Sequence, residues 1–248
     1  MLRRLLASLR TDLPPVPLAG RLDPAAIAIP MVASVCLVVS FYHGSPPQWA
    51  QVALFLPRVE LPYSLCSYLF WFAASVALYL VAPFGALLLL REPLREYGLG
   101  PGRWRLGLAI CVLFLAVMIP VAIIAARFPA FANHYPRVRD ARQSFGLLAL
   151  YELGQASYLV AWEYLFRGFL LIGLYRRIGL HAIYVTTMPF VMLHLGKPEP
   201  EALASVFAGV ALGYMALKTR SFWWGTLLHI GTIATMDIAS SWSHLGRG

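Results

Sequence analysis

The sequence predicts an all-α fold, a polytopic integral membrane helical bundle of about seven transmembrane helices, with eight as the alternative. Composition is the first reason. Of the 248 residues, 60% are hydrophobic and 12% are charged, whereas an ordinary soluble domain has roughly 25% charged residues. The mean hydropathy is +0.69. The second reason is that the apolar residues form runs of about 20, the length that crosses the hydrocarbon core of a bilayer.

The apolar runs place the expected helices along the chain. Seven segments are expected to span the membrane: residues 24–43, 64–90, 106–126, 145–175, 181–196, 202–217 and 222–242. Pro83 predicts a kink in the second segment, because proline removes a helical hydrogen bond. The fourth segment contains Gly154 and Gly168 and is long enough to form one helix or two helical pieces. The segment around residues 49–62 is too short and too rich in proline to count as a span.

Basic residues predict how the helices are oriented. Four clusters precede the first span, follow the second and the fourth, and precede the last: Arg3, Arg4, Arg10 and Arg21; Arg91, Arg95, Arg103 and Arg105; Arg176 and Arg177; Lys218 and Arg220. Seven spans would put all four clusters on one side, which their charge identifies as cytoplasmic, together with the N-terminus. The expected location is the plasma or inner membrane. The loop 127–143, with Arg127, Arg137, Arg139 and Arg142, breaks this pattern.

The net charge of +9 does not indicate a nucleic-acid partner. The arginines lie in short loops between apolar runs, where the positive-inside rule and attraction to anionic lipid headgroups explain them. The expected partner is therefore the lipid bilayer, and no nucleic acid is expected.

Glu163, Arg167, His194 and His229 are ionisable residues inside three of the apolar segments. An ionisable group at membrane depth costs several kcal/mol, so it indicates a functional site. Glu163, His194 and His229 lie 13, 13 and 9 residues from Arg176, His181 and Arg220, which mark the cytoplasmic ends of their spans. At about 1.5 Å per residue, each lies roughly 13–20 Å deep. The three helices could therefore build one shared pocket.

Each of these residues also has a structural interpretation. Glu163 and Arg167 could form an ion pair that fixes helix packing. His194, followed by a turn at Gly196, could be a helix-end histidine bonded to a backbone carbonyl. His229 could be a hydrogen-bonded packing residue.

The chemistry that such a pocket supports is hydrolysis. One glutamate and two neutral histidines match a catalytic zinc set, so Glu163, His194 and His229 are candidate metal ligands, with a coordination position left for water. Alternatively, Glu163 and a histidine activate water directly while the other histidine stabilises an oxyanion, and no metal is needed. Arg167, four residues after Glu163, is expected to orient the carboxylate.

These residues resemble the motifs of a known family. Glu163 with Phe166-Arg167-Gly168, Phe190-x-x-x-His194 and His229 are similar to the three motifs of the CPBP intramembrane metalloproteases. This family contains the type II CAAX proteases and the bacteriocin-processing (ABI) proteins, and its pattern is Glu-Glu-x-x-x-Arg, Phe-x-x-x-His and His-x-x-x-Asn/Asp. The resemblance covers about residues 145–240. It implies a domain division into residues 1–144 without recognisable motifs, a protease-like core at 145–242 and a tail at 243–248.

Two positions depart from the family pattern. Trp162 stands where the first glutamate of the pair is expected, the residue usually assigned to water activation, and Ile233 replaces the Asn/Asp of the third motif. Either Glu163 has become the base, or another carboxylate helps, or proteolysis has been lost. Glu152 returns to nearly the same helix face as Glu163 but lies about 16 Å away along a straight helix. Asp237 lies eight residues after His229.

The resemblance implies an intramembrane peptidase that cleaves a membrane-associated CAAX-type or bacteriocin-related peptide or protein. Glu163 is then expected as water activator or ligand, His194 and His229 as ligands or oxyanion partners, and zinc as the metal if one is used. Two alternatives remain. One is a catalytically inactive relative acting as a membrane scaffold or immunity protein. The other is a small transporter whose path is lined by Glu152, Glu163 and Asp237.

Overall fold

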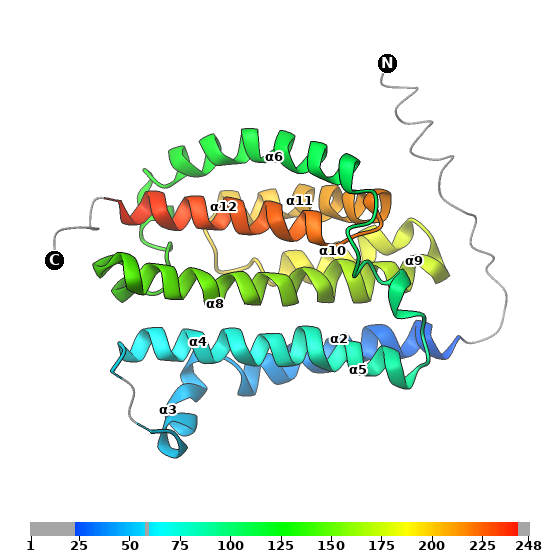
Figure 1. Ribbon diagram of the computed structural model, residues 1–248, viewed down its shortest axis with the longest axis horizontal. Helices are drawn as coiled ribbons and strands as arrows, with labels where there is room; N and C mark the ends of the chain where they lie inside the picture. Colours follow the sequence, from blue (N-terminus) through cyan, green and yellow to red (C-terminus); the bar gives the residue numbers. More distant parts are fainter. Residues whose placement is uncertain (1–22, 58–59, 243–248) are drawn as a thin grey trace.

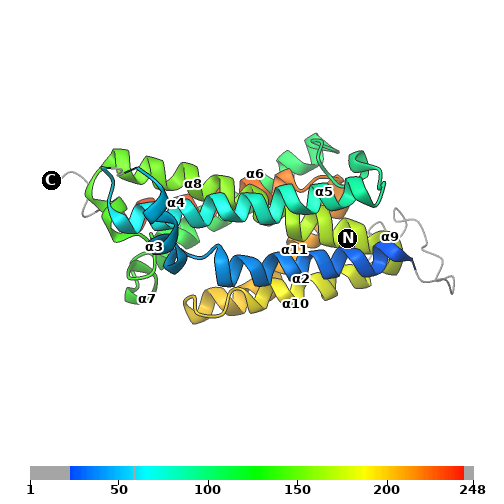
Figure 2. The ribbon, with the colours of Figure 1, turned by 90° about the horizontal axis from the view of Figure 1, so that it is seen from below.

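The computed structural model describes residues 23–57 and 60–242, which form only helices and the turns between them. The basic N-terminal segment and the tail at 243–248 lie outside the described residues. The helices lie side by side (Figure 1 and Figure 2). In Figure 1, α6 (Trp104–Ala125) is on one face, α12 (Trp223–Ser241) and α11 (Glu199–Thr219) lie beneath it, α8 (Phe145–Glu163) is in the middle, and α2 (Pro24–His43), α4 (Tyr63–Val76) and α5 (Ala82–Leu89) are on the opposite face. The all-α fold predicted from composition is confirmed.

The main helices follow the predicted segments closely. They are α2 (Pro24–His43), α4 (Tyr63–Val76), α5 (Ala82–Leu89), α6 (Trp104–Ala125), α8 (Phe145–Glu163), α9 (Gly173–Ile178), α10 (His181–Met192), α11 (Glu199–Thr219) and α12 (Trp223–Ser241). A π-helical segment, η3 (Ala77–Val81), joins α4 to α5 directly before Pro83. The irregularity predicted at Pro83 therefore takes the form of a wider helical turn that accommodates the missing N–H. Short helical turns, among them α3 (Trp49–Val52), fill the segment that was not expected to span.

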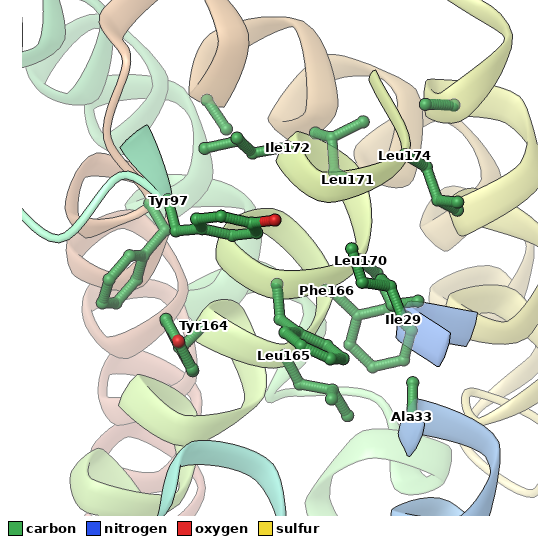
Figure 3. Packing of buried hydrophobic residues seen from close by; sticks show 14 of the residues in the cluster. Ile29, Ala33, Tyr97, Tyr164, Leu165, Phe166, Leu170, Leu171, Ile172 and Leu174 are labelled. Atoms are coloured by element: carbon green, nitrogen blue, oxygen red, sulfur yellow. The ribbon is translucent and has the colours of Figure 1, made fainter. Parts of the chain in front are cut away.

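The central helix runs without interruption from α8 through the π-helical segment η6 (Tyr164–Ile172) into α9. It begins where the Ser144 hydroxyl accepts the N–H of Leu147 and ends at Gly179, whose φ of 59° favours glycine. All nine residues of η6 are buried. Figure 3 shows several of them packed around Tyr97 and around Ile29 and Ala33 of α2. The site residues of the first motif are thus held in the most enclosed part of the bundle.

Contacts bring together the helix ends that carry three of the four basic clusters, whereas the first cluster, Arg3 to Arg21, lies outside the described residues. Arg177 contacts Asp23 at 2.7 Å and Glu92 at 2.6 Å, so the start of α2, the end of α5 and the end of α9 meet. The N–H of Arg103 donates to the carbonyl of Thr219 at 2.7 Å, which brings the start of α6 to the end of α11. Which side of the membrane this end faces stays a prediction.

Within the described residues, five helices are long and apolar enough to cross a membrane: Pro24–His43, Tyr63–Leu89, Trp104–Ala125, Phe145–Ile178 and Glu199–Thr219. The predicted count of seven or eight spans is not confirmed. The expected span at 181–196 was wrong in extent, because α10 ends at Met192 after 12 residues. Twelve residues rise only about 18 Å, less than the roughly 30 Å of hydrocarbon. The last expected span, 222–242, forms α12, which is not among these five helices. Its 19 residues include the polar side chains of His229 and Asp237.

The contact between α6 and α12 positions the helix that carries His229. A Cβ atom at Gly107 would lie 2.3 Å from the indole of Trp224, so this pair of helices requires glycine there. Gly107→Ala is expected to destabilise the protein by about 1–3 kcal/mol, because a rigid ring must move. Thermal unfolding in detergent measures this effect. The matched control is Gly85→Ala in α5, where a Cβ meets nothing within 4 Å; an equal loss in both variants would contradict the packing argument.

Candidate active site

Glu163 is the last residue of α8 and is completely buried. Its Oε1 accepts a hydrogen bond from Nδ1 of His229 at 3.0 Å, and its Oε2 lies 3.4 Å from Nε of Arg167. The carboxylate is therefore held between a histidine of α12 and a guanidinium one turn along its own helix. Gly225 permits this approach, because a Cβ there would stand 3.1 Å from Oε2 of Glu163.

The guanidinium of Arg167 connects the first motif to the second. Its side chain is 4% exposed, and its Cζ lies 4.1 Å from the centre of the Phe190 ring in α10. A cation over an aromatic face is stabilised most where water is excluded. The two terminal nitrogens have no hydrogen-bond partner among the described residues, so Glu163 and the Phe190 ring are what compensate the buried charge. This geometry explains the phenylalanine of the second motif.

His194 lies just after the end of α10 rather than within it. Its Nδ1 donates to the carbonyl of Phe190 at 2.7 Å, which is the helix-end geometry of the structural alternative. The ring nevertheless lines a cavity, with Nε2 unprotonated because the carbonyl can only accept. Burial, and then the positive charge of Lys197, lowers the pKa of His194 to about 3. The imidazole is therefore neutral at ordinary pH.

A cavity of about 270 Å³ lies beside these residues, and its wall includes His194, His229 and Trp162. Trp162, at the position of the missing first glutamate, packs against Phe166 with ring centres 4.8 Å apart and against His194 at 6.2 Å. It forms one wall and leaves the space open. Since a water molecule takes about 30 Å³ of liquid, the cavity has room for several.

A second, larger cavity of about 890 Å³ meets the same two histidines. Its other walls are mostly apolar side chains of α6, α11 and α12, among them Phe114, Leu212 and Leu228. Ile233, which replaces the polar residue of the third motif, lines both cavities. Both histidines thus line two cavities, one with polar and aromatic walls and one with apolar walls.

The structure brings together some predicted site residues and separates others. Glu163 is in direct contact with Arg167 and with His229, and His194 shares both cavities with His229. Among the residues that the structure describes, no group of three His, Cys, Asp or Glu side chains is placed to hold a metal ion. Zinc ligation by Glu163, His194 and His229 therefore stays a prediction.

The two carboxylates considered as helpers lie elsewhere. Glu152 keeps its distance from Glu163 because α8 continues unbroken past Gly154. Asp237 accepts a 2.6 Å hydrogen bond from Gln155, whose own carbonyl oxygen accepts the hydroxyl of Tyr151 at 2.8 Å. Neither carboxylate lines the two cavities.

Two residues of the site were missed by sequence analysis. Gly225 was missed because a glycine in an apolar helix carries no chemical signal of its own. Arg137, which lines the smaller cavity, belongs to the loop that breaks the orientation pattern, and that departure was the available signal.

Fold and site together define an all-helical protein with apolar helices of membrane-spanning length and a buried glutamate–histidine pair beside a cavity. Residues 156–234 match the family model of the type II CAAX prenyl endopeptidases, Rce1-like. This match confirms the resemblance indicated by the three motifs, and it includes Glu163, Arg167, His194 and His229. It indicates an integral membrane protein with a function of the CAAX-protease type. No curated protein and no solved structure matches the chain significantly.

Proposed function

We propose that the protein is an intramembrane peptidase that hydrolyses a peptide bond in a membrane-associated substrate of the CAAX or bacteriocin-related type. One observation carries this proposal: the 3.0 Å hydrogen bond between Glu163 and His229 lies at a cavity that His194 also lines. A buried carboxylate that fixes one nitrogen of a histidine leaves the other nitrogen as a base, an arrangement that recurs in hydrolases.

His229 is the water-activating group that the geometry favours. Because its Nδ1–H donates to Glu163, its Nε2 carries the free lone pair. Nε2 takes a proton from water while the water oxygen attacks the carbonyl carbon of the substrate. The carboxylate of Glu163 stabilises the resulting imidazolium, which then delivers the proton to the leaving amine. Glu163 thus acts through His229, since the carboxylate is completely buried and does not line the cavity.

His194 has a different task. Its Nδ1–H is used by the Phe190 carbonyl, so Nε2 can only accept a hydrogen bond or a metal. A nitrogen that only accepts can orient the attacking water through the O–H of the water. It cannot donate to an oxyanion, which was the other role expected from the sequence.

Of the three zinc ligands that the family resemblance implies, only the two histidines, His194 and His229, are arranged as ligands in this structure. In both histidines Nδ1 faces an oxygen acceptor, which leaves Nε2 as the nitrogen available to a metal, as in metal-binding histidines. Glu163, the expected third ligand, is instead turned to His229 and Arg167. Among the described residues, Glu163, His194 and His229 are not arranged as three ligands of one ion, so the proposed mechanism uses them without a metal, and the chelator experiment below tests the zinc prediction.

The larger cavity supports a membrane-associated substrate. Its walls are nearly all apolar and it meets the site at His194 and His229. An apolar portion of a substrate could occupy it while the peptide bond lies at the histidines.

Two observations bear on the alternatives. A scaffold would have Trp162 filling the pocket, but the cavity remains open beside it. A transporter would have its carboxylates along a path, but Glu152, Glu163 and Asp237 do not line either cavity. Both observations favour hydrolysis.

The decisive experiment is cleavage of a peptide library by the purified protein in liposomes. Wild type is expected to cleave, whereas Glu163→Gln and His194→Ala are expected to lose about 10²–10⁴-fold in rate, the usual contribution of acid–base groups. A chelator arm tests for a metal, since loss of activity on chelation would show that one is required. No cleavage by wild type, or equal cleavage by all three proteins, would overturn the proposal.

A further inference from the structure

Arg137 differs from the nearby positive groups Arg167 and Lys197 because, within residues 23–57 and 60–242, no carboxylate forms an ion pair with it. Arg167 is paired with Glu163. Lys197 donates to Oε1 of Glu201 at 2.7 Å, and the same carboxylate accepts the hydroxyl of Tyr135. Among the residues that the structure describes, no carboxylate lies within salt-bridge distance of the guanidinium of Arg137.

The guanidinium of Arg137 is held in a defined place. Its Cζ lies 5.1 Å from the centre of the Trp71 ring, and Trp71 and Tyr158 line the cavity with it. The loop that carries Arg137 is also fixed, because Arg142 donates to the backbone carbonyls of Ala132 and Tyr135. The neighbouring Val138 is 1% exposed. Arg137 is therefore a positioned group of the cavity wall.

Arg137 is half-buried in the cavity wall, and a partly desolvated guanidinium is stabilised when an anion pairs with it. The face of Trp71 stabilises the charge in part. Asp237, the buried carboxylate of this region, already accepts a hydrogen bond from Gln155 and makes no ion pair with Arg137. Of all side chains, arginine matches the planar, two-oxygen geometry of a carboxylate best. The cavity thus offers a prepared position for an external carboxylate, in the same space as His194 and His229.

We propose that Arg137 binds a carboxylate of the substrate in this cavity and so selects peptides that carry one close to the bond to be cleaved. This inference rests on the proposed function and extends it to substrate selection. The family match does not assign the role, because Arg137 lies outside residues 156–234. The carboxylate could be a C-terminal α-carboxylate or an acidic side chain, and the experiment separates these sources.

The test uses random-sequence, lipid-anchored peptide pools that differ in one feature. One pool ends in a free carboxylate, a second ends in an amide and lacks acidic residues, and a third ends in an amide but contains glutamate. Wild type, Arg137→Gln, Arg137→Lys and Arg139→Gln are compared in liposomes. Arg139, an exposed arginine two residues away in the same loop, is the matched control.

Wild type is expected to prefer one carboxylate pool over the neutral pool by about tenfold or more in KM, the usual strength of a hydrogen-bonded charge pair. Preference for the first pool identifies the C-terminal α-carboxylate as the bound group, and preference for the third pool identifies an acidic side chain. Arg137→Gln is expected to lose the preference with kcat within about twofold, Arg139→Gln to keep it, and Arg137→Lys to be intermediate, because lysine lacks the two-pronged geometry. Equal KM for all pools, or a preference that survives Arg137→Gln, would overturn the inference.

Binding of the same pools to wild type, measured without cleavage, separates this inference from the proposed function. Carboxylate-selective binding that is lost in Arg137→Gln supports the carboxylate site even where no cleavage occurs. Equal binding of all pools overturns the site even where cleavage occurs. If Arg137→Gln fails to fold in a thermal-unfolding check, Arg137→Lys carries the comparison, and an unchanged preference in that variant overturns the proposal.

Discussion

Replacing His229 with glutamine is expected to lower kcat for peptide cleavage by about 10²–10⁴-fold, because the substitution removes the nitrogen that takes the proton from water. The side-chain amide of glutamine can still donate a hydrogen bond to Glu163, in place of the 3.0 Å bond from Nδ1 of His229. KM is expected to change little, because in the proposed mechanism other parts of the cavities bind the substrate. Steady-state kinetics in liposomes measure both constants.

The matched control for His229→Gln is His181→Gln. His181 is an exposed histidine at the start of α10 and takes no part in the cavities. It is expected to keep wild-type kinetics. A His229→Gln protein that still cleaves at more than about a tenth of the wild-type rate would show that His229 is not the base.

Removing either partner of the Glu163–Arg167 pair is expected to destabilise the protein by about 3–5 kcal/mol, because the remaining charge stays buried without its partner. The exposed fractions of the two side chains are 0% and 4%, so neither can turn to water. Removing both charges, in Glu163→Gln with Arg167→Met, is expected to cost less than the sum of the two single changes. Thermal unfolding of all four proteins in the same detergent gives this difference.

Glu201→Gln provides the comparison for this cycle. Glu201 pairs with Lys197, which also lies four residues away in the sequence, but the side chain of Glu201 is 20% exposed. A partly solvated pair contributes less, so the loss is expected to be clearly smaller than for Glu163→Gln. Losses that simply add in the Glu163 and Arg167 double variant would show that the two charges do not stabilise each other.

Most of the fold could be predicted because a membrane allows few solutions. Backbone groups in hydrocarbon must be bonded within their own segment, so each apolar run has to be a helix. The runs at 24–43 and 145–175 correspond to α2 and to the central helix, which begins at Phe145. The meeting of Glu163 and His229 was predicted from their similar depth, since two polar groups at one level of a bundle are stabilised by finding each other.

The parts that could not be predicted depend on contacts between distant segments. The π-helical segment η6 after Glu163 leaves no pattern in its own residues, because its geometry is stabilised by packing against α2 and Tyr97. The early end of α10, which puts His194 in a turn, depends on local bonds to the carbonyls of Pro189, Phe190 and Val191. The hydropathy of the sequence carries no information on these hydrogen bonds, so the end of α10 could not be predicted from it.

The sequence by itself predicted a helical membrane bundle and singled out Glu163, Arg167, His194 and His229 as the candidate site residues. Depth in the membrane and residue type are local properties, and they were enough for that. Only the tertiary structure decided which of these side chains contact one another and which line the cavities. It turned Glu163 toward His229 and Arg167, left an open cavity beside Trp162, and placed Arg137 from a distant loop against that cavity. The reason is that hydrogen-bond direction and the pairing of buried charges are set by the packing of helices that lie far apart in the chain.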